Sequence, residues 1–163
     1  MKNKGYIISG IQQMGVGVSD LTEAWEWYIK AFGMDCRIFE DEAEARLMLP
    51  YTDGEPRSRH AVLAMNLQSG GGFEVWQHKG KKPEYRDRET KLGDLGIFAC
   101  KMKVKDVESA WKYWSDNGVT VLGKPVADPA GRKNFFVRDP FGNLFHIVEA
   151  TDWFMNLKKI SGG

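Results

Sequence analysis

A single imidazole near the end of the chain is the first candidate for chemistry. The run Asp139-Pro140-Phe141-Gly142-Asn143 predicts a tight turn, because Pro presets φ and Gly or Asn accepts a positive φ. The residues that follow alternate as in a strand, with Phe145 and Ile147 on one face. His146 therefore lies on the opposite face. An imidazole in that position is either a hydrogen-bonded pocket residue or a metal ligand.

Two cations are placed where they could face the same site. Arg132 precedes a predicted strand, and its guanidinium could bind a substrate carboxylate or phosphate. The alternative for Arg132 is a solvated loop cation. Lys101 shares a strand face with Ala99, where it either supplies a fixed positive charge or is solvated. Neither a Ser, His and Asp triad nor a reactive cysteine can be argued from the sequence.

Composition places the chain among ordinary globular proteins. It has 163 residues, of which 42% are hydrophobic and 28% are charged. A net charge of +1 gives no electrostatic argument for nucleic acid or an acidic membrane as a partner. The apolar runs are too short to span a membrane. The 2 cysteines show no paired spacing, which favours a reducing, cytoplasmic location.

An internal repeat sets the organisation of the chain. The segments 18–28 and 104–114 share Val, Asp, an aliphatic residue, Ala and Trp in the same register. Asp20 and Asp106 are favourable N-caps, so each copy predicts a helix that begins just after its Asp. Gly33 and Gly118 are expected to end the two helices.

Strands are expected on both sides of each helix. The alternation of apolar and polar residues predicts one strand before each helix and several strands after it. The strands expected after the helices are 36–40, parts of 45–49, 60–67 and 73–77 in the first half, and 119–122, 134–137 and 143–149 in the second half. Each half is therefore a βαβββ module, and the fold class is α+β. We expect a single domain over 1–163, built from modules at 8–78 and 95–150 with a tail at 151–163.

These features resemble the vicinal oxygen chelate superfamily, which includes glyoxalase I, extradiol dioxygenases and bleomycin resistance proteins. The paired modules and the Asp-Pro-Phe-Gly-Asn turn carry the resemblance, which spans about residues 8–149. It implies that the modules form a curved, cup-shaped mixed sheet with the helices outside. It also implies a small-molecule substrate and often a homodimer.

The resemblance implies a site on the first and last strands of each module. Carried over by position, its residues are Gln13, Glu74 and His146, and Ala99 takes the place of a fourth ligand. Such a set suits a divalent Zn, Ni, Co, Mn or Fe ion. The chain departs from the family pattern at Ala99, which cannot ligate, and at His146, where Glu is commonest.

Two functions follow from the resemblance. In the first, the protein is a glyoxalase-like lyase or isomerase that stabilises an enolate-type intermediate, with Glu74 as a metal ligand or as the catalytic base. In the second, it is a non-catalytic protein that sequesters a small molecule in a metal-free aromatic cup. Trp76 and Phe135 are the expected aromatic contacts, and Lys101 and Arg132 the expected polar contacts.

Overall fold

The computed structural model describes residues 11–68, 71–80, 82, 84 and 87–151. The start of the first predicted module and residues 152–163 of the predicted tail lie outside these ranges. In chain order the elements are β1 (Gln13–Gly17), α1 (Leu21–Phe32), β2 (Cys36–Glu44), the 3-10 helix η1 (Arg46–Tyr51), β3 (Ser58–Met65), β4 (Gly72–His78), β5 (Cys100–Val104), α2 (Val107–Asp116), β6 (Thr120–Ala127), β7 (Lys133–Arg138) and β8 (Leu144–Glu149).

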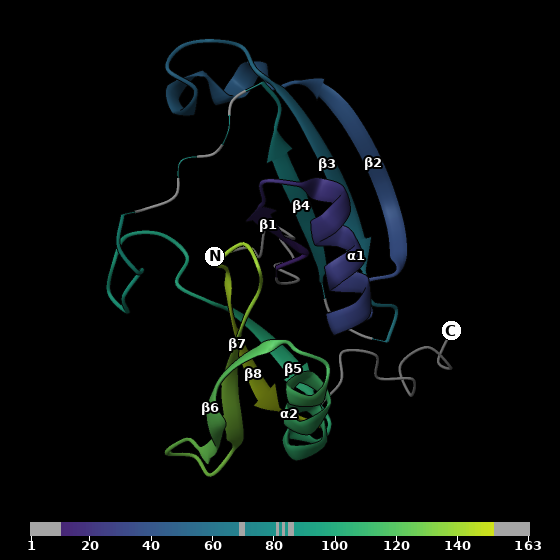
Figure 1. Ribbon diagram of the computed structural model, residues 1–163, viewed down its shortest axis with the longest axis vertical. Helices are drawn as coiled ribbons and strands as arrows, with labels where there is room; N and C mark the ends of the chain where they lie inside the picture. Colours follow the sequence, from purple (N-terminus) through teal and green to yellow (C-terminus); the bar gives the residue numbers. More distant parts are fainter. Residues whose placement is uncertain (1–10, 69–70, 81, 83, 85–86, 152–163) are drawn as a thin grey trace, which may run out of the picture.

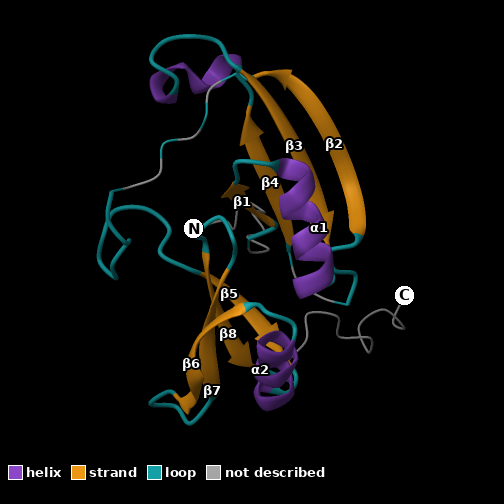
Figure 2. Cartoon of the chain, in the orientation of Figure 1, coloured by secondary structure: helices purple, strands orange, loops and turns teal. Residues whose placement is uncertain are grey.

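The strands form two four-stranded mixed sheets with the same topology. The first has the order β1-β4-β3-β2 and the second the order β5-β8-β7-β6. In each, the first and last strands of the module pair in parallel and the remaining pairs are antiparallel. One helix covers one face of each sheet, α1 on the first and α2 on the second (Figures 1 and 2). The predicted α+β class and tandem βαβββ order are confirmed. We call the uncovered side of each sheet its open face.

The helix boundaries follow the capping residues. The Asp20 carboxylate accepts a hydrogen bond from the Glu23 backbone N–H, and Asp106 plays the same part at α2. Gly33 ends α1 in the left-handed region with φ of 65°. The helix α2 ends earlier than expected, because Asn117 rather than Gly118 follows its last residue. None of the helices in the described residues is long and apolar enough to cross a membrane.

The prediction of a strand within 45–49 is wrong, because residues 46–51 form η1. The preceding strand β2 continues to Glu44, where it pairs with Ser58 at the start of β3. β3 is already paired on both sides by β2 and β4, so the residues after β2 cannot pair with it. Thr52 instead hydrogen-bonds the carbonyls of Met48 and Glu55, which closes the segment locally.

The core is a cluster of aromatic rings shared by both modules. Phe32 at the end of α1 contacts Trp114 of α2 edge to face, with ring centroids 5.6 Å apart. Phe73 of β4 and Phe145 of β8 meet at 5.5 Å. The Trp114 indole N–H also donates to the Ala31 carbonyl at 2.7 Å. Because these contacts join elements far apart in the chain, the two sheets are held in one packed unit.

A buried hydrogen bond also joins the modules. The Tyr28 hydroxyl of α1 donates to Asp139 Oδ2 at 2.5 Å, and both residues are almost fully buried. The other oxygen of Asp139 accepts the backbone N–H groups of Phe141 and Asn143 at 2.9 and 2.7 Å. Gly142, with φ of 89°, completes this turn. The turn predicted from the sequence is therefore also the connection between the modules.

We predict that Asp139→Ala lowers the free energy of unfolding by about 2–4 kcal/mol, because it leaves the buried Tyr28 hydroxyl without a partner. Asp128→Ala is the matched control. It removes the same pair of backbone hydrogen bonds from a second Asp-Pro turn, with no buried hydroxyl involved. Urea unfolding measures both. Equal losses in the two variants would show that Asp139 acts only within its turn.

A pH dependence follows from the same pair. Burial, and then the negative charge of Asp139, raise the pKa of Tyr28 well above its ordinary value. The unfolded chain ionises this tyrosine above about pH 10, whereas the folded protein does not. The stabilisation is thus complete below pH 10 and falls above it, by up to about 1.4 kcal/mol per pH unit. Unfolding of wild type and Tyr28→Phe between pH 8 and 11 should show this slope in the wild type alone.

Candidate functional site

Glu74 lies on the open face of the first sheet, as alternation predicts. Its neighbours Phe73 and Val75 are buried on the helix side. The Gln13 side-chain N–H of β1 donates to Glu74 Oε2 at 2.7 Å, because β1 and β4 run in parallel side by side. Gly15 stands directly opposite Glu74, and a Cβ placed there would meet nothing within 4 Å. The absence of a side chain at that position leaves open space beside the carboxylate.

His146 lies on the open face of the second sheet, where its ring is fixed on two sides. It stacks on Phe136 of β7, with ring centroids 4.5 Å apart. Its Nε2 lies 3.0 Å from the Asn134 side-chain oxygen. Because the amide nitrogen of Asn134 donates to the Val126 carbonyl, its oxygen faces the imidazole. Nε2 is then the protonated nitrogen, and Nδ1 keeps a lone pair.

Two causes lower the pKa of His146. Burial is the larger, and the ammonium of Lys101 is the second; Asp128 acts weakly in the opposite direction. Lys101 stands directly opposite His146 in the parallel register of β5 and β8. The imidazole is consequently neutral near pH 7. Lys101 is exposed on the strand beside His146, so its positive charge acts on the imidazole while the lysine remains solvated.

The other predicted contacts divide between site, core and surface. Phe135 is a correction: it is 2% exposed and packs against Trp114, so its ring is in the core and that of Phe136 is on the open face. The strand begins one residue earlier than predicted, but the alternation itself places Phe135 on the helix side. The Arg132 guanidinium binds Asp128 at 3.1 Å with 64% of its side chain exposed, which matches the loop-cation alternative.

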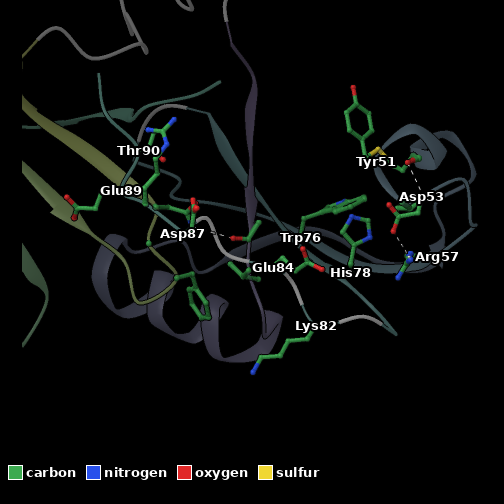
Figure 3. A pocket seen from close by; sticks show the side chains of 18 of the residues that line it. Tyr51, Asp53, Arg57, Trp76, His78, Lys82, Glu84, Asp87, Glu89 and Thr90 are labelled. Atoms are coloured by element: carbon green, nitrogen blue, oxygen red, sulfur yellow. Dashed lines mark hydrogen bonds and ion pairs between the residues drawn. The ribbon is translucent and has the colours of Figure 1, made fainter. Parts of the chain in front are cut away.

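Trp76 lies on the open face of β4 and lines a cavity of about 1020 Å³ (Figure 3). The cavity walls come from residues within 48–57, from Lys82, Glu84 and residues 87–90, and from the turn after β7. His78 and Arg57 also line it, and the sequence reasoning did not select them. The signal for His78 was present, since alternation from Glu74 through Trp76 places it on the same face. Arg57 comes from a loop, where no periodicity applies.

The predicted metal ligands come from both sheets. Gln13 and Glu74 are hydrogen-bonded to each other, whereas His146 is on the second sheet beside the ammonium of Lys101. Ala99 has no ligand atom. Among the residues that the structure describes, no three His, Cys, Asp or Glu side chains are grouped so that they could hold a metal ion. The Gln13 amide oxygen, Glu74 Oε1 and His146 Nδ1 keep lone pairs that could ligate a divalent ion, whereas the positive charge of Lys101 disfavours one beside His146.

Comparison with known proteins identifies the family. The family model described as Glyoxalase/Bleomycin resistance protein/Dioxygenase superfamily matches residues 10–147. The chain belongs to this superfamily. The resemblance drawn from the sequence is thereby confirmed, and members of the superfamily often use divalent metals. No curated protein matches the chain.

Solved structures of the superfamily share this fold at low sequence identity. A glyoxalase family protein from Bacillus cereus matches with a TM-score of 0.70 and 13% identity, covering 90% of this chain and 97% of that chain. A superfamily member from Sphaerobacter thermophilus has a TM-score of 0.62, 20% identity and coverage of 88% and 98%. A glyoxalase I variant from Zea mays has a TM-score of 0.58, 16% identity and coverage of 86% and 45%. At these identities the likeness concerns the fold alone.

We predict that His146 titrates below the ordinary histidine pKa and that Lys101→Gln raises its pKa. Removing the ammonium favours the imidazolium, while burial still holds the pKa below its ordinary value. The ring C–H signals in an NMR titration report this, and His146→Gln assigns them among the 3 histidines. Lys124→Gln, a lysine on β6, is the control. An unchanged pKa in Lys101→Gln would mean that the ammonium is turned away from the ring.

Proposed function

We propose that this protein is a lyase or isomerase that removes a proton beside the carbonyl of a small substrate, with Glu74 as the base. The observation that carries the proposal is the environment of Glu74. Its carboxylate is oriented by Gln13, faces open space beside Gly15, and makes no ion pair within the described residues. A carboxylate that no cation neutralises remains available as a proton acceptor.

The local structure supports a directed proton transfer. The Gln13 amide holds Oε2, so Oε1 is the oxygen left for the substrate proton. The side chain of Glu74 is partly buried on a regular strand, which keeps its position fixed. The same face continues to Trp76, whose indole borders the cavity and offers an apolar surface to a substrate.

The second sheet supplies charge and a second basic atom. Proton removal beside a carbonyl leaves negative charge on oxygen, which an ammonium such as Lys101 stabilises. His146 is neutral, and its Nδ1 lone pair can take or return a proton. We assign Lys101 to the enolate oxygen and His146 to proton exchange in an isomerase. A small molecule is the expected partner, and a homodimer is part of the proposal as well.

The superfamily also supports a divalent ion as a proposal, with Gln13, Glu74 and His146 as the residues that would hold it. When bound, such an ion polarises the carbonyl that it contacts. The proton transfer proposed for Glu74 does not depend on this ion.

We predict that Glu74→Gln abolishes substrate proton exchange. Purified protein is incubated in D₂O with 2-oxoaldehyde–thiol adducts and acyl thioesters, and NMR follows loss of the proton beside the carbonyl. Loss of the base should slow exchange at least about 100-fold. Glu42→Gln is the matched control, since Glu42 is on the helix side of β2, opposite the open face. Exchange that persists in Glu74→Gln would remove Glu74 from the reaction, and no exchange by wild type would favour the binding-protein alternative.

Metal content is tested separately. After reconstitution with Zn²⁺, Ni²⁺, Co²⁺, Mn²⁺ or Fe²⁺ and desalting, elemental analysis compares wild type with the Glu74→Ala, His146→Ala double variant. Because the positive charge of Lys101 opposes a cation beside His146, we expect little retained metal in either protein. Retention of near one ion per wild-type chain that disappears in the double variant would instead establish the metal site on these residues.

A further inference from the structure

Two residues that line the cavity beyond Glu74 each carry a buried nitrogen atom that has no hydrogen-bond partner among the described residues. The two atoms are Nε of Arg57 and Nδ1 of His78. Both residues line the cavity, Arg57 from the loop before β3 and His78 from the end of β4. Native proteins pair nearly all buried polar atoms, because an unpaired one costs about 1–3 kcal/mol. Two unpaired nitrogens on residues that line one cavity indicate a partner that binds there.

The charge of Arg57 is also weakly compensated. Among the residues that the structure describes, its ion pair is from Nη2 to Asp53 Oδ2 at 3.5 Å, which is longer than an ordinary hydrogen bond. The other described arginines of the wall are paired more closely, Arg88 with Asp94 at 2.9 Å and Arg138 with Glu89 at 3.1 Å. The Arg57 side chain keeps 22% of its surface exposed, so the guanidinium can turn its Nε edge toward a ligand.

Charged side chains of both signs line the cavity. Figure 3 shows Asp53 beside Arg57 and Glu84 near His78, with Asp87 and Glu89 farther along the cavity. An anionic group would therefore be recognised by directed hydrogen bonds from Arg57 and His78 rather than by the net charge of the cavity. Trp76 lies next to His78, with ring centroids 4.7 Å apart. A flat apolar group attached to the anion would meet the indole there.

We infer that this cavity binds the anionic end of a planar, conjugated acid through Arg57 and His78, with the body of the molecule against Trp76. A guanidinium and an imidazole N–H both donate to carboxylate or phosphate oxygens, and the planar guanidinium can do so with two parallel bonds. The inference names the substrate class for the proposed reaction. It rests on the proposed function for the part of the substrate that loses a proton to Glu74. On one strand, Glu74 and His78 are about 13 Å apart at roughly 3.3 Å per residue. The substrate is thus an extended acid, with its acidic group remote from the carbon that loses a proton.

Isothermal titration calorimetry of the full chain with benzoate, benzamide and inorganic phosphate tests the inference. We expect saturable benzoate binding, at least about tenfold weaker binding of the uncharged benzamide, and a loss of about tenfold or more in Arg57→Gln. Arg88→Gln is the matched control, an arginine of the same wall that Asp94 already pairs, and should change affinity less than about twofold. Tighter binding of phosphate than of benzoate, if also lost in Arg57→Gln, would assign the site to phosphate esters rather than carboxylic acids.

The inference is overturned if neither anion binds, if benzamide binds as well as benzoate, or if Arg57→Gln binds as the wild type does. Arg57→Lys serves as a second variant where Arg57→Gln is unstable, since it keeps the charge and loses the paired donors. Glu74→Gln separates this test from that of the reaction. If Glu74→Gln loses proton exchange but still binds the anion, the anion site is supported. If the wild type exchanges the proton but binds no anion, the proposed function is supported and the anion site is overturned.

Discussion

The hydrogen bond between the Tyr28 hydroxyl and the Asp139 carboxylate is the constraint on which the arrangement of the two modules depends. It is buried, and it joins the helix of the first module to a turn of the second. A carboxylate that is buried away from water needs hydrogen-bond donors for both of its oxygens. Asp139 accepts hydrogen bonds from the Tyr28 hydroxyl, from two backbone N–H groups of its own turn and from the side chain of Asn143. Moving either module would leave several of these groups unpaired at once.

The connection between Tyr28 and Asp139 determines part of the shape of the cavity. Phe141 and Asn143, which follow Asp139, line its wall together with Gly17 of β1. The Asn143 side chain also reaches the Gly17 carbonyl at 3.4 Å. One wall of the cavity is thus built from the second module and its floor from β4 of the first. Tyr28, which does not line the cavity, in this way determines where the residues of this wall lie.

The sequence predicted the parts of the fold that local patterns determine. Asp20, Asp106 and Gly33 fixed helix ends because capping involves only neighbouring residues, and period-two alternation placed Glu74 and His146 on the open faces. The sequence did not predict the features that depend on contacts between residues far apart in the chain. The segment after β2 became a 3-10 helix because β3 had no free edge, and the partners of Asp139 and the unpaired nitrogen of Arg57 exist only once the modules are packed. Phe135 was a different case, since alternation already placed it in the core.

The two open faces have become chemically different although their strands still correspond. On the first face, Gln13 orients a carboxylate and Gly15 leaves room beside it. On the second, the equivalent of Gln13 is Ala99, and Lys101 places an ammonium beside His146. A symmetric cluster of acidic and imidazole ligands would hold a divalent ion, whereas this pair of faces separates a base from a cation. In the reaction that we propose, the carboxylate takes the proton and the cation stabilises the charge that develops on oxygen.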